Sequence, residues 1–245
     1  MQLEIKFEQS NTKIDVEFDS VNYVSDGGFE RGYEQGYNKG YDEGYANGES
    51  ESGGNIWQYV ATVSFAGIKF PDDYELVLKL PSLTDSISSM IRGAGGLKKI
   101  KLIASVTKYA VNMWHAFSGV STVETIDLTE FYCEKIGRFE SAFASDVALS
   151  EILGQLNLTT ATNLAQAFNR TVKLVTVSFV EKSIFLDISF ADSPLLSTES
   201  IQSIIDGLAD LTGQTAKTLT LHTEVKAKLT DEQIATITSK NWNLA

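Results

Sequence analysis

The sequence predicts an α/β fold in which short, parallel β-strands stack at a regular interval to form a solenoid. Three observations support this prediction. Between residues 74 and 196, an aromatic residue followed by apolar residues at fixed offsets returns about every 25 residues, and self-similarity at such a period is typical of stacked repeats. The apolar residues that end each copy alternate with polar ones, as in a half-buried strand. Two segments with helix-capping residues follow the last copy.

Residues 1–27 are expected to form an N-terminal β-hairpin that attaches the protein to a partner. Apolar and polar residues alternate in residues 3–7 and again in residues 14–18, and residues 9–12 between them supply turn-forming side chains. An isolated hairpin is marginally stable in water, so its apolar face needs a surface to pack against. That surface could belong to the same chain, to a second copy or to another protein.

Residues 28–55 contain a second repeat, followed by a linker. From residue 28 to residue 48 every fourth residue is glycine, and an aromatic residue follows each of the first five; the aromatic residues are Phe29, Tyr33, Tyr37, Tyr41 and Tyr45. On a helix, four residues advance about 400°, so these rings stay on one broad face. The interior glycines cost such a helix about 4 kcal/mol, more than its aromatic pairs return. We therefore expect an oligomerising helix that forms where copies of the chain pack together, and the alternative is a disordered tether.

The central repeat lies in residues 56–196, which are expected to form the solenoid, with residues 56–73 as its N-terminal cap. Phe117 and Phe143 lie 26 residues apart, and Phe168 follows 25 residues later. Each copy is expected to contribute one strand, and strands stacked at a constant period pair in parallel, while the leading residue closes the turn from the other side. The leading residues are Ile91, Phe117, Phe143, Phe168 and Phe190.

Residues 197–245 are expected to close the array as an α/β cap. Residues 197–200 can cap a helix, apolar residues then recur at helical spacing up to residue 211, and Gly213 is expected to end that helix. Residues 218–221 alternate as a strand. Thr230 and Gln233 have the spacing of a capping box before a second, short helix.

Composition excludes several classes of protein. The formal net charge of −12 argues against nucleic acid as a partner, because phosphate binding needs clustered Lys and Arg. The single cysteine, Cys133, excludes a disulfide framework within the chain and is expected to be a small buried side chain. The chain contains no run of 18 apolar residues and its N-terminus has no apolar core, so neither a signal peptide nor a transmembrane segment nor membrane insertion is expected.

No motif in the sequence indicates an enzyme. His115 and His222 are far apart, and neither has a second His or Cys at metal-ligand spacing. Residues 93–96 followed by Lys98 superficially suggest a phosphate loop, but the loop lacks the Gly-Lys-Ser/Thr ending and precedes a strand. We therefore expect a non-enzymatic protein without a metal or other cofactor.

The exposed face of the predicted sheet is the candidate recognition surface. Polar residues between the apolar strand positions should line up across neighbouring strands, and curved sheets of this kind bind partners along such a ladder. Two aromatic residues just beyond a strand end could add a contact to a sugar or a protein loop. The alternative is a merely solvated ladder with both aromatic residues in the core. The candidates are Lys99, Lys101, Thr125, Asp127, Thr129, Phe131, Tyr132, Thr176 and Ser178.

The central repeat resembles the BspA-like leucine-rich repeats of bacterial surface proteins. The resemblance rests on residues 88–102, 114–128 and 162–179 and covers about half of the chain. That family often has Cys two residues after the aromatic, where Gly119 and Ser145 stand here, so the copies are diverged. The resemblance implies a curved parallel-sheet solenoid used for adhesion and recognition, with no catalytic residues.

The termini of the chain are similar to those of repeat proteins encoded in bacteriophages and prophages. This similarity implies a virion component associated with the tail or baseplate, which binds a host cell-surface glycan or protein and contacts other virion proteins. Adhesin-like repeats without an export signal fit this location, because virion proteins assemble in the host cytoplasm. Likeness to tail appendages favours a trimer as the homo-oligomer. The alternative is a bacterial leucine-rich-repeat adhesin or a cytoplasmic protein-interaction scaffold.

Overall fold

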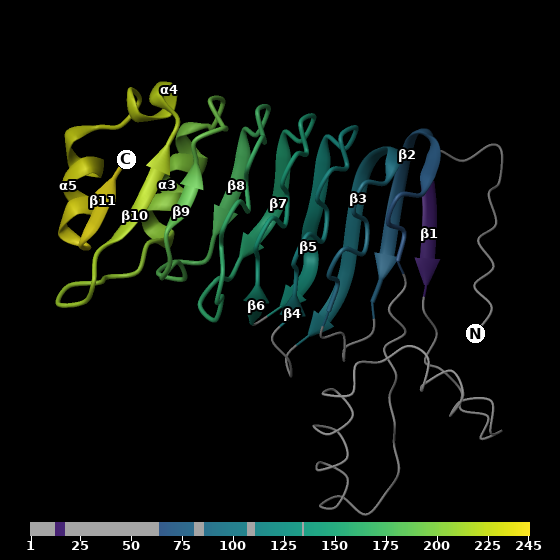
Figure 1. The fold of residues 1–245 in the computed structure, drawn as a ribbon, viewed down its shortest axis with the longest axis horizontal. Helices are drawn as coiled ribbons and strands as arrows, with labels where there is room; N and C mark the ends of the chain where they lie inside the picture. The colour runs from purple at the N-terminus through teal and green to yellow at the C-terminus, as the bar shows by residue number, and fades with distance from the viewer. Residues whose placement is uncertain (1–12, 18–63, 81–85, 107–110, 134) are drawn as a thin grey trace, which may run out of the picture. The chain divides into compact units, whose positions relative to one another are not determined.

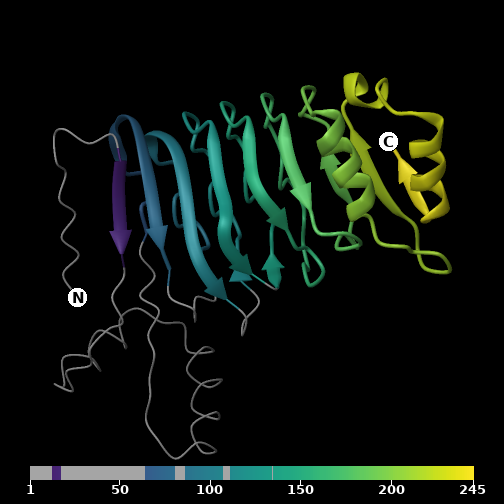
Figure 2. The same cartoon turned by 180° about the vertical axis from the view of Figure 1, so that it is seen from behind.

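The main element of the fold is a mostly parallel β-sheet accompanied by few helices (Figures 1 and 2). This computed structural model describes residues 13–17, 64–80, 86–106, 111–133 and 135–245. Six strands form the main sheet in the order β1-β2-β3-β5-β7-β8, and every neighbouring pair is parallel. The strands are β1 (Lys13–Glu17), β2 (Lys69–Lys79), β3 (Gly95–Val106), β5 (Thr125–Cys133), β7 (Glu151–Leu156) and β8 (Thr176–Phe179).

Regular spacing of apolar residues aligns these strands. Leu76 pairs with Ile100, Ile100 with Ile126, and Ile126 with Ile152, so one buried residue from each of four strands lies in register. Because side chains alternate between the two faces of a strand, this register keeps the apolar residues on the core side. The predicted parallel pairing is confirmed.

The N-terminal part of the sheet differs in detail from the expectation. Strand β1 pairs in parallel with β2, whereas residues 3–7, the other arm of the predicted hairpin, lie outside the described residues. The Gly-Tyr segment with Phe29, Tyr33, Tyr37, Tyr41 and Tyr45 also lies outside them. Strand β2 begins at Lys69 and thus includes residues 71–73, so the N-terminal cap does not end at residue 73 as predicted. Asp73 has a positive φ of 66°, and the β2–β3 register shifts next to it.

Tight turns form a second hydrogen-bonded ladder, here called the turn ladder, from residues 87–94, 113–120, 139–146 and 164–171. Every second N–H of one segment donates to a carbonyl of the next, as Phe117 does to Ala142 and Phe143 to Ala167, both at 3.0 Å. A short parallel pair, β4 (Val111–Asn112) and β6 (Ile136–Arg138), leads into two of the segments.

The backbone of the turn ladder repeats more faithfully than its side chains. The residues two positions before Ile91, Phe117, Phe143 and Phe168 all have φ between 52° and 58°, and those two positions after have φ between 59° and 78°. Only glycine adopts this left-handed region without strain, so the hydrogen-bonded ladder holds the other residues there. The residues with positive φ before the leading residues are Ser89, His115, Ser141 and Gln166, and those after them are Gly93, Gly119, Ser145 and Arg170.

The aromatic residues of the turn ladder stack in the core. Ring centroids are 5.3 Å apart between Phe117 and Phe143, 5.7 Å between Phe143 and Phe168, and 4.5 Å between Phe168 and Phe190. All four side chains are buried. The column therefore joins successive segments through direct ring contacts, which stabilise more than their buried area alone.

The C-terminal part combines a second sheet with three helices. Its parallel strands have the order β11-β10-β9. The capping box at Thr230 and Gln233 forms as predicted, while no helix in the described part of the chain is long and apolar enough to cross a membrane. The elements are β9 (Ile188–Phe190), α3 (Thr198–Gly207), β10 (Lys217–Leu221), α4 (Thr223–Lys226), α5 (Asp231–Ser239) and β11 (Trp242–Leu244).

Helix α3 ends at Gly207, so the prediction that it continues to Gly213 is wrong. Leu208 adopts an extended conformation, with φ −64° and ψ 126°, and forms a parallel bridge with Ile184. The helical spacing of apolar residues continues to Leu211, but tertiary hydrogen bonds to the Ile184 backbone take the chain out of the helix.

Helix α3 occupies the place where a further strand would pair with β8 (Figure 2). The Ser200 hydroxyl accepts a hydrogen bond from Val177 N at 3.0 Å and donates to Val175 O at 2.9 Å. The Ser203 hydroxyl accepts from Phe179 N at 2.9 Å. Side-chain hydroxyls thus satisfy edge groups that a neighbouring strand would otherwise satisfy. The main sheet thus ends at β8, and β9 connects the second sheet to the turn ladder through the stacking of Phe190 on Phe168.

Candidate functional site

The candidate recognition residues lie on three strands of the main sheet. Lys99 aligns with Thr125, and Lys101 aligns with Asp127, so β3 and β5 bring these four together. Strand β7 separates them from β8, and its Glu151 and Gln155, which the prediction omitted, pair with the β8 candidates. Lys99 and Lys101 belong to β3; Thr125, Asp127, Thr129, Phe131 and Tyr132 to β5; Thr176 and Ser178 to β8.

The face of the main sheet that carries Lys99, Lys101 and Asp127 is here called the strand face. Its charges neutralise one another. Lys99 Nζ lies 3.5 Å from Asp127 Oδ2 and 3.7 Å from Glu75 Oε1. Lys101 donates to Glu130, and this hydrogen bond raises the pKa of Lys101. Burial disfavours ionisation of Asp127, but hydrogen bonds from the Thr129 hydroxyl and N–H, with the two lysines, hold its pKa below the ordinary value. The lysines are therefore already engaged within the sheet.

The other candidates are also partly engaged. Thr125 Oγ1 donates to Glu151 at 3.2 Å, and Ser178 Oγ donates to Gly154 O at 2.9 Å. Phe131 is 8% exposed and packs in the core, whereas Tyr132 is 58% exposed. Cys133, expected to be buried, is partly exposed at the end of β5.

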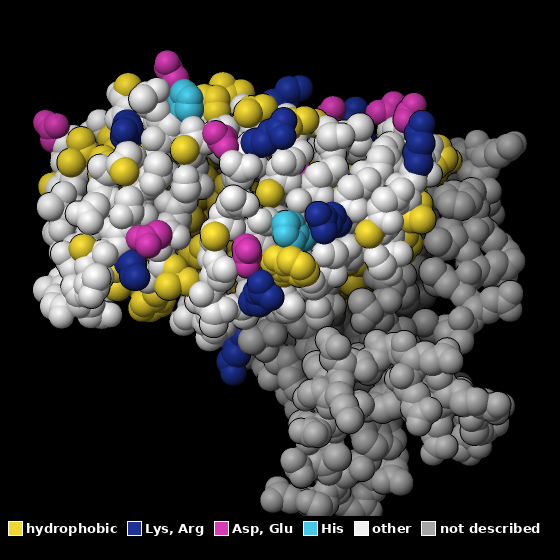
Figure 3. Space-filling model, in the orientation of Figure 1, with side chains coloured by type: hydrophobic (Ala, Val, Ile, Leu, Met, Phe, Trp, Pro, Cys, Tyr) yellow, Lys and Arg dark blue, Asp and Glu magenta, His cyan; other side chains and the backbone are white. Residues whose placement is uncertain are grey.

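A different group of side chains, here called the Trp114 cluster, lies on the turn ladder. It consists of Trp114, His115, Arg138, Glu140 and Asn163. Trp114, His115 and Glu140 belong to two segments of the turn ladder, and Arg138 and Asn163 directly precede the segments that begin at residues 139 and 164. The Trp114 and His115 rings meet edge to face at 4.7 Å, and the Arg138 guanidinium lies 5.3 Å from the Trp114 ring centre. Glu140 Oε2 accepts hydrogen bonds from Arg138 and Asn163, both at 2.8 Å. Figure 3 shows a histidine beside hydrophobic, basic and acidic side chains near the middle of this face.

The cluster forms where one segment departs from its neighbours. Five residues before each leading residue stand Ser86, Asn112, Arg138 and Asn163. Three of them accept the N–H two residues ahead, as Asn112 does from Trp114 at 3.0 Å. Arginine has no acceptor, so Arg138 cannot make this bond and extends to Trp114 and Glu140 instead. Alignment of the copies would have revealed this departure, whereas searching for motifs within one copy did not.

Two buried nitrogens of the cluster have no hydrogen-bond partner within the part of the chain that the structure describes. They are Trp114 Nε1 and His115 Nδ1. Burial is the main cause that lowers the pKa of His115, and Arg92 and Arg138 lower it further. The imidazole is thus neutral at pH 7, with one nitrogen as a donor and the other as an acceptor.

Asp146 is a second unusual polar group of the turn ladder. It is fully buried, and its Oδ1 accepts from Val120 N at 2.8 Å. Its Oδ2 has no partner among the described residues. Burial raises the pKa of Asp146 well above its ordinary value. At the equivalent place in the next two segments, the Thr171 and Ser193 hydroxyls bond each other at 2.8 Å.

Asp146→Asn is expected to remove a pH dependence from the stability of the protein. The folded state holds the Asp146 proton to a higher pH than the unfolded state does. The free energy of unfolding therefore falls as the pH rises from the ordinary aspartate pKa to the raised one. Asparagine stays neutral and keeps an oxygen for Val120, so its stability relative to the wild type should increase as the pH rises above about 4, the ordinary pKa of an aspartate. Urea unfolding at several pH values measures this difference.

Asp146→Ala serves as the control for the hydrogen bond. Relative to Asp146→Asn, it removes the acceptor at 2.8 Å and leaves Val120 N with only its longer bond to Phe117 O at 3.3 Å, so it should cost about 0.5–1.5 kcal/mol at every pH. Parallel pH profiles for the wild type and Asp146→Asn would contradict the raised pKa of the buried carboxyl group.

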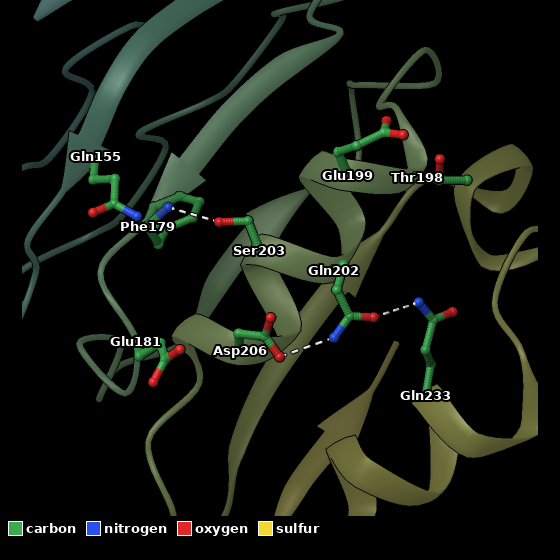
Figure 4. A pocket seen from close by; sticks show the side chains of 9 residues that line it. All are labelled: Gln155, Phe179, Glu181, Thr198, Glu199, Gln202, Ser203, Asp206 and Gln233. Atoms are coloured by element: carbon green, nitrogen blue, oxygen red, sulfur yellow. Dashed lines mark hydrogen bonds between the residues drawn. The ribbon is translucent and has the colours of Figure 1, made fainter. Parts of the chain in front are cut away.

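A shallow hollow of about 600 Å³ lies beside α3 (Figure 4). Several of the polar side chains that line it bond one another or the backbone. Gln202 donates to Asp206 at 2.8 Å and accepts from Gln233 of α5 at 2.9 Å. The hollow thus contains the network that ties α3 to α5. Its lining residues are Gln155, Phe179, Glu181, Thr198, Glu199, Gln202, Ser203, Asp206 and Gln233.

Neither metal chemistry nor similarity to known proteins identifies a site. Among the residues with described positions, no three His, Cys, Asp or Glu side chains gather in a way that could hold a metal ion. Comparison of the chain with protein-family models, with curated proteins and with solved structures finds no match in any of the three.

Proposed function

We propose that this protein is a non-enzymatic recognition protein built as a BspA-like leucine-rich-repeat solenoid. The observation that carries the proposal is the recurrence of left-handed backbone positions two residues before and two residues after each leading residue. Neighbouring segments donate to one another at a nearly constant sequence offset in the turn ladder, as strands do in the main sheet. Proteins with stacked repeats of this kind present long continuous surfaces and commonly use them for binding.

The proposed setting is the virion of a phage or prophage, at the tail or baseplate, where the protein binds a host cell-surface glycan or protein. Support comes from the resemblance of the repeat and from the Gly-Tyr segment, whose aromatic residues suit association of several chains, with a trimer favoured. Other virion proteins would then contact the N-terminal region. The same repeats on a bacterial adhesin or an interaction scaffold are the second possibility, and the neighbouring genes distinguish the two.

The test of recognition is saturable binding of the purified full chain. The chain is labelled and titrated onto a panel of bacterial cells and onto an array of cell-wall polysaccharides. We expect saturable binding to some cells or glycans, with no turnover of the bound ligand. Chemical conversion of a bound glycan would contradict the non-enzymatic proposal, and absence of saturable binding to every cell and glycan would contradict recognition of a cell surface.

A further inference from the structure

The Trp114 cluster has the composition of a ligand site, unlike the strand face. On the strand face, lysines and carboxylates pair across neighbouring strands. In the Trp114 cluster, a partly exposed aromatic corner stands beside a guanidinium, a carboxylate and an amide. We propose that this cluster binds an uncharged saccharide, with a sugar ring against Trp114 and its hydroxyl groups on Arg138, Glu140 and Asn163. The proposal rests on the proposed recognition function and names its ligand class.

The aromatic corner supplies the apolar half of such a site. The Trp114 and His115 rings are inclined at 70°, so they form two walls rather than one flat surface. A pyranose ring carries C–H groups on its faces and hydroxyl groups around its edge. Its face can therefore lie against the indole while its edge reaches polar groups, which is the use that proteins make of large amphipathic aromatic side chains.

Planar polar side chains supply the other half. Arg138 has five N–H donors, of which the contact with Glu140 uses one. Glu140 accepts, and Asn163 both donates and accepts. Two vicinal hydroxyl groups can accept from the guanidinium and donate to the carboxylate at the same time. The hydrogen bonds of Glu140 to Arg138 and Asn163 hold these groups in place before a ligand arrives.

The charge balance of the cluster favours an uncharged ligand. Arg138 and Glu140 form an ion pair at 2.8 Å, so an anion would face the carboxylate and a cation would face the guanidinium. A hydroxyl group is uncharged and both donates and accepts, so it matches the donors of Arg138, the acceptor of Glu140 and the amide of Asn163 alike.

Stability alone does not account for this arrangement. An unpaired buried polar group costs about 1–3 kcal/mol, and counting only partners among the described residues, the cluster contains two of them on adjacent residues. Arg138 also gives up the local hydrogen bond that Asn112 and Asn163 make at the same place. In exchange it contacts Trp114 and Glu140, and such departures from a local rule are expected at functional sites.

The test compares variants of the full chain on an array of neutral bacterial cell-wall mono- and oligosaccharides. Trp114→Ala and Arg138→Ala should each weaken binding of the glycans that the wild type binds by at least about tenfold. Trp114→Phe should recover part of the loss, because it restores a ring. Phe185→Ala is the matched control, since it removes an aromatic side chain that is 39% exposed and belongs neither to the Trp114 cluster nor to the strand face, and its affinity should stay within about twofold of the wild type. Tyr132→Ala tests the strand face as the alternative site.

Each remaining outcome decides against a defined part of the proposal. If Tyr132→Ala loses binding while Trp114→Ala and Arg138→Ala keep it, recognition stands and the site is wrong. If the wild type binds cells but no neutral glycan, recognition stands and the ligand class is wrong. If it binds neither, the recognition function fails as well. If Trp114→Ala does not fold, Arg138→Ala decides alone, because the Arg138 side chain is 46% exposed.

Discussion

Phe143→Ala is expected to destabilise the protein by about 3–5 kcal/mol, the range for truncation of a large aromatic residue in a core. The Phe143 ring is fully buried. It stacks between Phe117 and Phe168 and meets Phe139 edge to face at 5.5 Å. Removing it opens a cavity in the middle of the aromatic column, where rings on both sides lose a partner. Urea unfolding of the full chain, followed by circular dichroism, measures the loss.

Phe185→Ala is the matched control for this prediction. It removes the same side chain at a position that is 39% exposed, so less area is lost from the folded state and the cost should stay below about 1 kcal/mol. Equal destabilisation by the two variants would show that the stacked rings do not form the core of the molecule.

Deletion of residues 197–245 should convert the protein into an aggregating species. Helix α3 covers Val177 and Phe179, and its Ser200 and Ser203 hydroxyls satisfy their N–H groups. Without the helix, β8 becomes an open edge of a parallel sheet beside newly exposed apolar side chains, which is a template for pairing with other chains. Light scattering of the truncated chain should show large particles under conditions in which the full chain gives none.

The double variant Ser200→Ala and Ser203→Ala separates the effect of the apolar cover by α3 from the effect of its hydroxyl hydrogen bonds. It keeps the apolar cover but leaves the Val177 and Phe179 N–H groups without partners, so it should remain soluble and lose about 1–3 kcal/mol for each group that stays buried and unpaired. A soluble truncated chain that melts cooperatively would show that α3 does not protect the edge of the sheet.

Local pattern predicts the elements of this fold better than their ends. Alternation placed the strands because burial of one face dictates a period of two, and the capping box at Thr230 formed because its partners lie within one helical turn. The end of α3 escaped prediction because the bridge between Leu208 and Ile184 joins residues far apart in the sequence. Turn residues with positive φ, such as Gln166, follow no propensity, since hydrogen bonds between segments impose them.

The candidate sites show the same division. The alignment of Lys101 with Asp127 follows from the sequence offset between the segments. Lys101 also bonds Glu130, and Asp127 accepts from Thr129, and these contacts depend on side-chain positions that the offset does not predict. Predicting the Trp114 cluster from the sequence requires comparing three successive segments of the same chain. Trp114 and Glu140 each look like ordinary surface residues within their own segment, and their relation appears only when the segments are stacked.

The hydroxyl contacts of α3 also determine how the sheet can open. An edge strand usually frays, because one of its sides has no partner and each residue can exchange its amide proton independently. Strand β8 is held by a helix whose residues are fixed together, so Val177 and Phe179 reach solvent when α3 leaves as a unit. The β8 edge of the sheet is therefore expected to open in one cooperative step, and not by gradual fraying of single residues.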